Sequence, residues 1–168
     1  TLGRCLPSVH SSGEMLCTWA RDHGITGTGI DMSSLFTAQA KRRAEELGVS
    51  ERVHFIHNDA AGYVANEKCD VAACVGATWI AGGFAGAEEL LAQSLKPGEI
   101  MLIGEPYWRQ LPATEEIAQA CGVSSTSDFL TLPGLVGAFD DLGYDVVEMV
   151  LADQEGWDRY EAAKWLTM

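Results

Sequence analysis

Acidic side chains follow two apolar segments of this 168-residue sequence, at the points where a buried strand would end. Asp31 closes the run at 26–32 (TGTGIDM), and Asp59 lies two residues beyond RVHFIH at 52–57. Ligands of an open parallel sheet bind outside the carboxyl ends of the strands. A carboxylate that ends the second strand can accept hydrogen bonds from both hydroxyls of a ribose. Asp31 is therefore a candidate ribose ligand, with the cap of a Ser-rich helix start as the alternative.

The first loop could supply the other half of such a site. Ser11, Ser12, Gly13 and Glu14 open a predicted helix, about twenty residues before Asp31. Small residues at this point would let a ligand approach the backbone amides at the helix N-terminus. The pairing of Gly13 with Asp31 fits a nucleotide site, although either residue could serve the fold alone.

Helix and strand patterns alternate along the chain, which predicts an α/β fold with a parallel sheet and helices on both faces. Gly24 and Gly48 suit the ends of the first two helices, and Ser33 or Ser34 suits the N-cap of the second. The helices are expected at 14–23, from that cap to 47, at 62–65, 84–95, 114–121 and 132–142, and from about 157. The strands are expected at 26–32, 52–57, 70–75, 99–104 and 144–151.

Two segments indicate where the core lies. Residues 70–75 (DVAACV) are nearly all apolar, as expected of a central strand covered on both faces. The second helix carries a set of apolar residues on roughly one face, which we expect to be buried. This set is Leu35, Phe36, Ala40, Ala44 and Leu47.

Composition is that of an ordinary globular protein, with 47% apolar and 21% charged residues. We expect one domain over residues 1–168. The net charge of −13 would repel phosphate backbones, so nucleic acid is not an expected partner. No run reaches the roughly twenty apolar residues of a membrane-spanning helix, so no membrane association is expected.

The five cysteines form no C-x-x-C pair and are odd in number, so neither a disulfide framework nor a metal site is expected. Cys69 and Cys74 flank a strand-like run, which predicts buried thiols in a reducing compartment and hence a cytoplasmic protein. The sequence does not begin with Met and stops inside a helical pattern. We therefore expect a fragment that is incomplete at both ends, with its last strand missing.

Three segments, taken in order and spacing, resemble the class I S-adenosylmethionine-dependent methyltransferases of small-molecule type. They are GTGIDMS at 27–33, HNDAAG at 57–62 and SLKPGEIMLIGEPYW at 94–108. In the third segment, Glu99 stands where the family's turn has a second glycine. The resemblance covers about Gly13 to Leu151. It implies a Rossmann-like, doubly wound, mostly parallel sheet and methyl transfer from S-adenosylmethionine to a small organic acceptor.

The resemblance also implies contacts to the nucleoside, residue by residue. Asp31 would bind the ribose hydroxyls, and Met32 would pack on one face of the adenine. Asp59 would accept a hydrogen bond from the exocyclic amine of the adenine, with the Ala60 amide nearby. Turn formation by Asp59 and core packing by Met32 are the alternatives.

The methionine end of the cofactor would lie between the first loop and the end of the fourth strand. The residues implied there are Ser11, Gly13, Glu14, Cys74, Val75 and Gly76. Aligned on Gly13, the family's acidic residue and two earlier glycines are replaced by Pro7, Val9 and Ser11. Pro7 cannot donate to a central strand ladder, so residues 4–10 form an atypical first strand. A non-catalytic relic with a decayed glycine loop is therefore a second hypothesis.

Methyl transfer is an in-line displacement that needs alignment and exclusion of water more than a fixed catalytic triad. Glu105 is the candidate catalytic base or acceptor contact, with a solvated or capping carboxylate as the alternative. Trp79, Tyr107 and Trp108 would provide apolar walls for the acceptor. A NAD-dependent oxidoreductase would also explain Gly13 and Asp31, but it explains LKPGE and HNDAAG less well.

Overall fold

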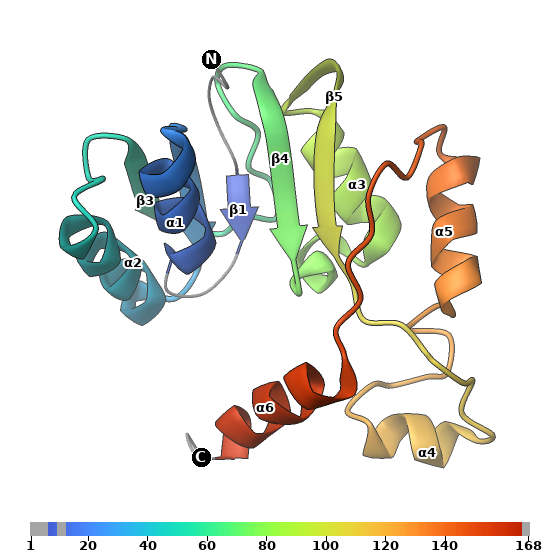
Figure 1. The fold of residues 1–168 in the computed structure, drawn as a ribbon. Helices are drawn as coiled ribbons and strands as arrows, with labels where there is room; N and C mark the ends of the chain where they lie inside the picture. Colours follow the sequence, from blue (N-terminus) through green and yellow to red (C-terminus); the bar gives the residue numbers. More distant parts are fainter. Residues whose placement is uncertain (1–6, 10–12, 166–168) are drawn as a thin grey trace. The chain divides into compact units, whose positions relative to one another are not determined.

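The computed structural model describes residues 7–9 and 13–165, which divide into two compact units, 1–106 and 107–168 (Figure 1). The first unit is built on a five-stranded sheet in the order β3-β2-β1-β4-β5, and its strand pairs are parallel. The strands are β1 (Pro7–Val9), β2 (Gly27–Asp31), β3 (Val53–His57), β4 (Cys69–Val75) and β5 (Leu95–Gly104). The predicted α/β class with a parallel sheet is confirmed.

Helices cover both faces of this sheet. They are α1 (Glu14–His23), α2 (Ser34–Glu46), the 3-10 helix η2 (Thr78–Ala81) and α3 (Phe84–Ala92). The side chains of β4 alternate between two apolar clusters, as the period of a strand requires. Ala73 packs in the cluster that holds Leu16 of α1, and Ala72 packs in the cluster that holds Leu91 of α3. The sheet is therefore doubly wound, as predicted.

Local signals set the end of α1 and the start of α2 where the sequence placed them, whereas α3 ends at Ala92 and not at the predicted residue 95. The α1 helix ends at Gly24, whose φ of 67° is the left-handed conformation that glycine adopts without strain. Ser33 caps α2, since its hydroxyl accepts a hydrogen bond from the Phe36 amide at 3.3 Å. A side-chain acceptor at this position satisfies one of the free amides of the first turn.

The buried face of α2 differs from the predicted one. Its buried residues are Thr37, Ala40 and Ala44, whereas Leu35 and Phe36 are 61% and 41% exposed. Small side chains at i, i+3 and i+7 form the stripe that contacts the sheet. Leu35 and Phe36 lie in the first turn of α2, and neither is buried, so the prediction for these two side chains is wrong.

Three backbone segments depart from simple expectation. Pro7 opens the central strand β1, where proline is tolerated because it occupies the first position, and the strand has only three residues. β5 begins at Leu95 and not at residue 99. The residues of the expected turn at 96–98 lie inside the strand, where the register between β4 and β5 shifts. Residues 62–65 form no helix, since the Ala65 amide donates to the Ser94 hydroxyl at 3.0 Å instead.

The second unit contains α4 (Glu115–Ala120), α5 (Leu132–Asp141) and α6 (Gln154–Trp165). The expected strand at 144–151 does not form: these residues are neither helix nor strand. A strand needs a neighbouring strand for its backbone groups, and no described strand lies in register with this segment. Val147 and Val150 are accordingly 81% and 86% exposed. In the described part of the chain, no helix has the length and apolar character to cross a membrane.

Candidate functional site

The carboxyl ends of β2 and β3 lie side by side. Asp31 and His57 are register partners, and the Asn58 amide donates to the Asp31 carbonyl at 3.1 Å. His57 Nε2 lies 3.0 Å from the Met32 carbonyl, which joins the two segments just beyond the strands. Asp59 follows two residues after β3. The predicted pair of aspartates therefore stands at neighbouring strand ends.

Each aspartate uses one carboxylate oxygen to hold its own turn. Asp31 Oδ1 accepts from the Ser33 amide at 2.7 Å, and Asp59 Oδ1 accepts from the Ala61 amide at 2.9 Å. Both aspartates therefore also serve the alternative role, which is to stabilise a local turn or the start of a helix. Among the described residues, however, neither Oδ2 atom has a hydrogen-bond partner, and neither side chain is buried. The turns orient two carboxylates whose second oxygens can accept further hydrogen bonds.

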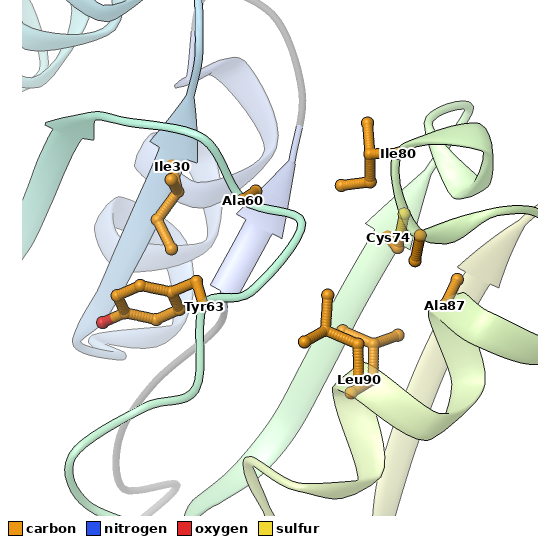
Figure 2. A pocket seen from close by; sticks show the side chains of 9 residues that line it. Ile30, Ala60, Tyr63, Cys74, Ile80, Ala87 and Leu90 are labelled. Carbon is orange, nitrogen blue, oxygen red and sulfur yellow. The ribbon is translucent and has the colours of Figure 1, made fainter.

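A small apolar pocket lies beside the segment that follows β3, from which Ala60 and Tyr63 line it (Figure 2). It contains about 350 Å³ of empty space, part of which is open to solvent. Its walls come from β2, the segment after β3, β4, η2 and α3. The lining residues are Ile30, Ala60, Tyr63, Cys74, Ile80, Ala81, Ala87, Leu90 and Leu91. Two residues of the predicted cofactor site, Ala60 and Cys74, therefore meet at one pocket, while Met32 is exposed and does not belong to the core.

The end of β4 reaches the same edge of the sheet. Cys74 is buried, and burial raises the pKa of its thiol to about 11, so the side chain is a neutral apolar group at physiological pH. Val75 is half-buried and Gly76 is exposed. The Gly76 amide donates to the Gly104 carbonyl at 2.8 Å, which fixes the chain as it leaves the strand.

The first loop has a structural explanation of its own. Gly13 is buried with φ 69°, and a Cβ atom there would lie 2.7 Å from Ala40 Cβ and from Phe55 Cζ. Glycine is therefore required for α1 to approach α2 and β3. Ser11 lies outside the described residues.

Glu14, also predicted at the cofactor site, is engaged elsewhere. Its two oxygens accept from Arg43 at 2.6 and 2.9 Å, and Thr18 donates to the same carboxylate. The hydrogen bond from Arg43 lowers the pKa of Glu14. The ion pair joins α1 to α2 across 29 residues of sequence, so no local pattern could have indicated it.

Glu105 follows β5 and is held by a residue to which sequence reasoning gave no role. The buried Thr78 hydroxyl donates to Glu105 Oε2 at 2.6 Å. Burial raises the pKa of Glu105, while the hydrogen bond from Thr78 acts in the opposite direction. The only sequence signal for Thr78 is its place in the loop after β4, at the edge where ligands are expected.

The three predicted aromatic wall residues fall in different units. Trp79, in the first unit, is 67% exposed. Tyr107 and Trp108 belong to the second unit, where the Trp108 indole donates to the Thr126 carbonyl at 2.9 Å and lies 5.5 Å from the Phe129 ring. A common acceptor wall from all three stays a prediction.

A parallel sheet in the order 3-2-1-4-5, with carboxylates at the ends of β2 and β3, defines a Rossmann-like nucleotide-binding class of domain. No family model matches the chain. It is 96% identical over 165 residues to the uncharacterized protein YjhP of Escherichia coli K12, covering 98% of this chain and 66% of that protein. The crystal structure of YjhP superposes with a TM-score of 0.95 at 93% identity, covering 99% of this chain and 69% of that one.

Two further solved structures carry a stated function. A methyltransferase dependent on S-adenosylmethionine from Geobacter sulfurreducens, in complex with S-adenosyl-L-homocysteine, is 72% identical, with a TM-score of 0.94. A counterpart from Thiobacillus denitrificans, with the same compound bound, is 69% identical, with a TM-score of 0.92. Each alignment covers 98% of this chain and 67% of the other. The chain belongs to the S-adenosylmethionine-dependent methyltransferases, which confirms the predicted family.

The chain is shorter than these relatives, since it spans 66% of YjhP and 67% of each methyltransferase. The family contradicts the alternative of a NAD-dependent oxidoreductase. The relic hypothesis concerns the altered first loop and stays a separate prediction.

Proposed function

We propose that the protein transfers a methyl group from S-adenosylmethionine to a small organic acceptor, and that the carboxyl edge of the first unit holds the cofactor. The observation that carries this proposal is the pair Asp31 and Asp59, which stand at neighbouring strand ends with one carboxylate oxygen each left to accept. S-adenosyl-L-homocysteine in the two methyltransferases of 69–72% identity supports it.

The donor and acceptor chemistry at this edge fits a nucleoside. Asp31, fixed by the Ser33 amide, would accept from the ribose hydroxyls, and Asp59, fixed by the Ala61 amide, would accept from the adenine amine. The exposed Met32 side chain and the apolar pocket at Ala60 would cover the faces of the base. Because both carboxylates are oriented before ligand arrives, little ordering free energy is lost on binding.

The remaining residues would position the methionine end and the acceptor. Backbone groups of Cys74, Val75 and Gly76 would line the methionine portion at the end of β4. The cofactor supplies a methyl group activated by its sulfonium centre. Glu105 would take a proton from the acceptor or hold it in line, and burial makes its carboxylate a stronger base than an exposed one.

The experiment is titration of S-adenosyl-L-homocysteine into the chain by isothermal calorimetry. Asp31→Asn should weaken binding by about 10- to 100-fold, because hydrogen bonds to a charged group are each worth roughly 1.5–3 kcal/mol. Glu51→Gln is the matched control: it removes one exposed carboxylate in the turn before β3, at the opposite edge of the sheet. Equal affinity of the Asp31 variant and the unaltered chain would refute the assignment.

A second titration addresses the relic hypothesis. If the unaltered chain keeps its circular dichroism but binds no S-adenosyl-L-homocysteine, Pro7→Asp, Val9→Gly and Ser11→Gly are introduced together. Recovery of binding would identify the first loop as the defect, whereas no recovery would contradict a cofactor site at this edge. NAD in the same cell is the competitor, and saturable NAD binding alone would also count against the proposal.

A further inference from the structure

Glu105 and Thr78 tie together the two loops that follow β4 and β5. The hydroxyl of Thr78 donates to Glu105 Oε2 at 2.6 Å, and the Gly76 amide donates to the Gly104 carbonyl at 2.8 Å. Thr78 is itself buried, and its carbonyl accepts from the Gly83 amide at 3.1 Å. The Glu105 carboxylate is therefore held in one orientation, half-buried, at the carboxyl edge of the sheet.

Trp79 is the residue after Thr78, and most of its indole is in contact with solvent. The hydrogen bond of Thr78 to Glu105 fixes the start of η2 and with it the backbone position of Trp79. A large aromatic side chain outside the core offers an electron-rich face to a ligand. The backbone of Trp79 therefore directly follows the residue whose hydroxyl holds the half-buried Glu105 carboxylate.

The positive side chains of the described part of the first unit belong to segments other than this loop. Arg52, Lys68 and Lys96 precede or begin β3, β4 and β5, at the amino edge of the sheet. Each is already bonded: Arg52 to the Gly24 carbonyl, Lys68 to the Gln93 carbonyl and Lys96 to Asp70. The other cations of the described part of this unit are Arg21, Lys41, Arg42 and Arg43, on α1 and α2. No cation from the segments 76–79 and 105–106 competes for the Glu105 carboxylate.

We propose that Glu105 and Trp79 recognise an ammonium group on the methyl acceptor, so that the substrate class is a positively charged amine. The inference rests on the proposed function and names the acceptor of that same site. A partly desolvated carboxylate attracts a cation more strongly than an exposed one does. An indole face adds cation–π attraction, and the same pair would reject a carboxylate-bearing acceptor.

Thr78 is a positioning residue in this scheme, since it acts through Glu105. Its hydroxyl binds Oε2, and in the part of the chain that the structure describes no hydrogen bond engages Oε1, which would receive the ammonium group. Thr78→Ser should keep the preference for cations because the hydroxyl remains. Thr78→Val, which keeps the shape but removes the donor, should reduce the preference by several-fold without changing the affinity for S-adenosyl-L-homocysteine.

The test compares benzylamine, benzyl alcohol and benzoate, three probes of similar size that are positive, neutral and negative at pH 7. Binding is measured by ligand-observed NMR, with and without saturating S-adenosyl-L-homocysteine. We expect benzylamine to bind at least about tenfold more tightly than benzyl alcohol, and benzoate more weakly than either. Glu105→Gln and Trp79→Leu should each remove most of this preference. Glu99→Gln, which neutralises an exposed carboxylate on β5, should retain it.

The outcomes separate the inference from the function on which it rests. Binding of S-adenosyl-L-homocysteine together with equal affinity for the three probes would overturn the amine assignment and leave the methyltransferase proposal standing. A benzylamine preference that survives Glu105→Gln would also overturn it. Absence of S-adenosyl-L-homocysteine binding with a preference that depends on Glu105 would refute the cofactor site alone. Circular dichroism of each variant shows that it is folded.

Discussion

The two units of the chain form helices by similar local means but differ in what those helices bury. In the first unit, α1 buries Leu16, Cys17 and Ala20 against the sheet. In the second, α5 is rich in apolar residues and buries none of them fully. Among the described residues, Ala118 is the one fully buried apolar side chain beyond residue 106. A segment can therefore form a helix without contributing to a core, because a core also requires a second apolar surface against which the helix packs.

Order in the second unit comes from polar contacts at helix ends. Thr114 and Thr131 accept from the amides of Ile117 and Gly134, which caps α4 and α5. Glu115 accepts from both the amide and the hydroxyl of Thr126 at 2.8 Å, and these bonds lower its pKa. Such contacts fix local geometry, but they stabilise a fold less than burial does.

The sharpest test of this difference is truncation of one helix residue in each unit. Leu16→Ala in α1 should lower the free energy of unfolding by about 2–5 kcal/mol, because it leaves a cavity in the core. Ile117→Ala in α4 should cost less than about 1 kcal/mol, since Ile117 is 49% exposed. Urea unfolding followed by circular dichroism measures both, and similar losses would contradict the comparison.

Cysteine reactivity compares the two units without changing their cores. Burial raises the pKa of Cys17 and Cys74 from 9.0 to about 11, so their thiolate fractions at pH 8 should be about 100-fold lower than in the unfolded chain. Cys121, in the second unit, is exposed. In a Cys5→Ser background, iodoacetamide should alkylate Cys121 first, as read by peptide mass spectrometry. Labelling of Cys17 or Cys74 at the rate of Cys121 would show that the core of the first unit does not shield these thiols from solvent.

Two glycines with left-handed backbone allow a smaller distinction. Gly13→Ala should destabilise the chain by about 2–4 kcal/mol, because strain adds to overlap with Ala40 and Phe55. Gly122→Ala, at φ 85° with no atom within 4 Å of the added carbon, should cost about 1–2 kcal/mol. Urea midpoints of the two variants give the comparison. If Gly13→Ala is the milder change, the close approach of α1 to α2 and β3 is not rigid.

The sequence by itself determined the features that depend on near neighbours. Gly24 ends α1 and Ser33 caps α2, because each acts on a backbone group within four residues. The apolar run at 70–75 became the buried strand β4, and the ordered motifs at 27–33, 57–62 and 94–108 were enough to identify the family. Asp31 and Asp59 could be placed at one edge because parallel strands end on the same side of a sheet.

Tertiary structure alone decided the features whose partners lie far away in the chain. Packing against the sheet determines which face of α2 is buried. Residues 96–98 belong to β5 because β4 pairs with this strand on both sides of them, at Leu95 and from Ile100 onward. The hydrogen bond between Thr78 and Glu105 joins two loops that no local pattern links. Residues 144–151 carry a strand pattern, but no described strand pairs with them, so the segment does not join a sheet. The hydrophobic periodicity of a segment indicates which of its side chains can be buried. Whether they are buried depends on the neighbouring helix or strand that the folded chain brings against them.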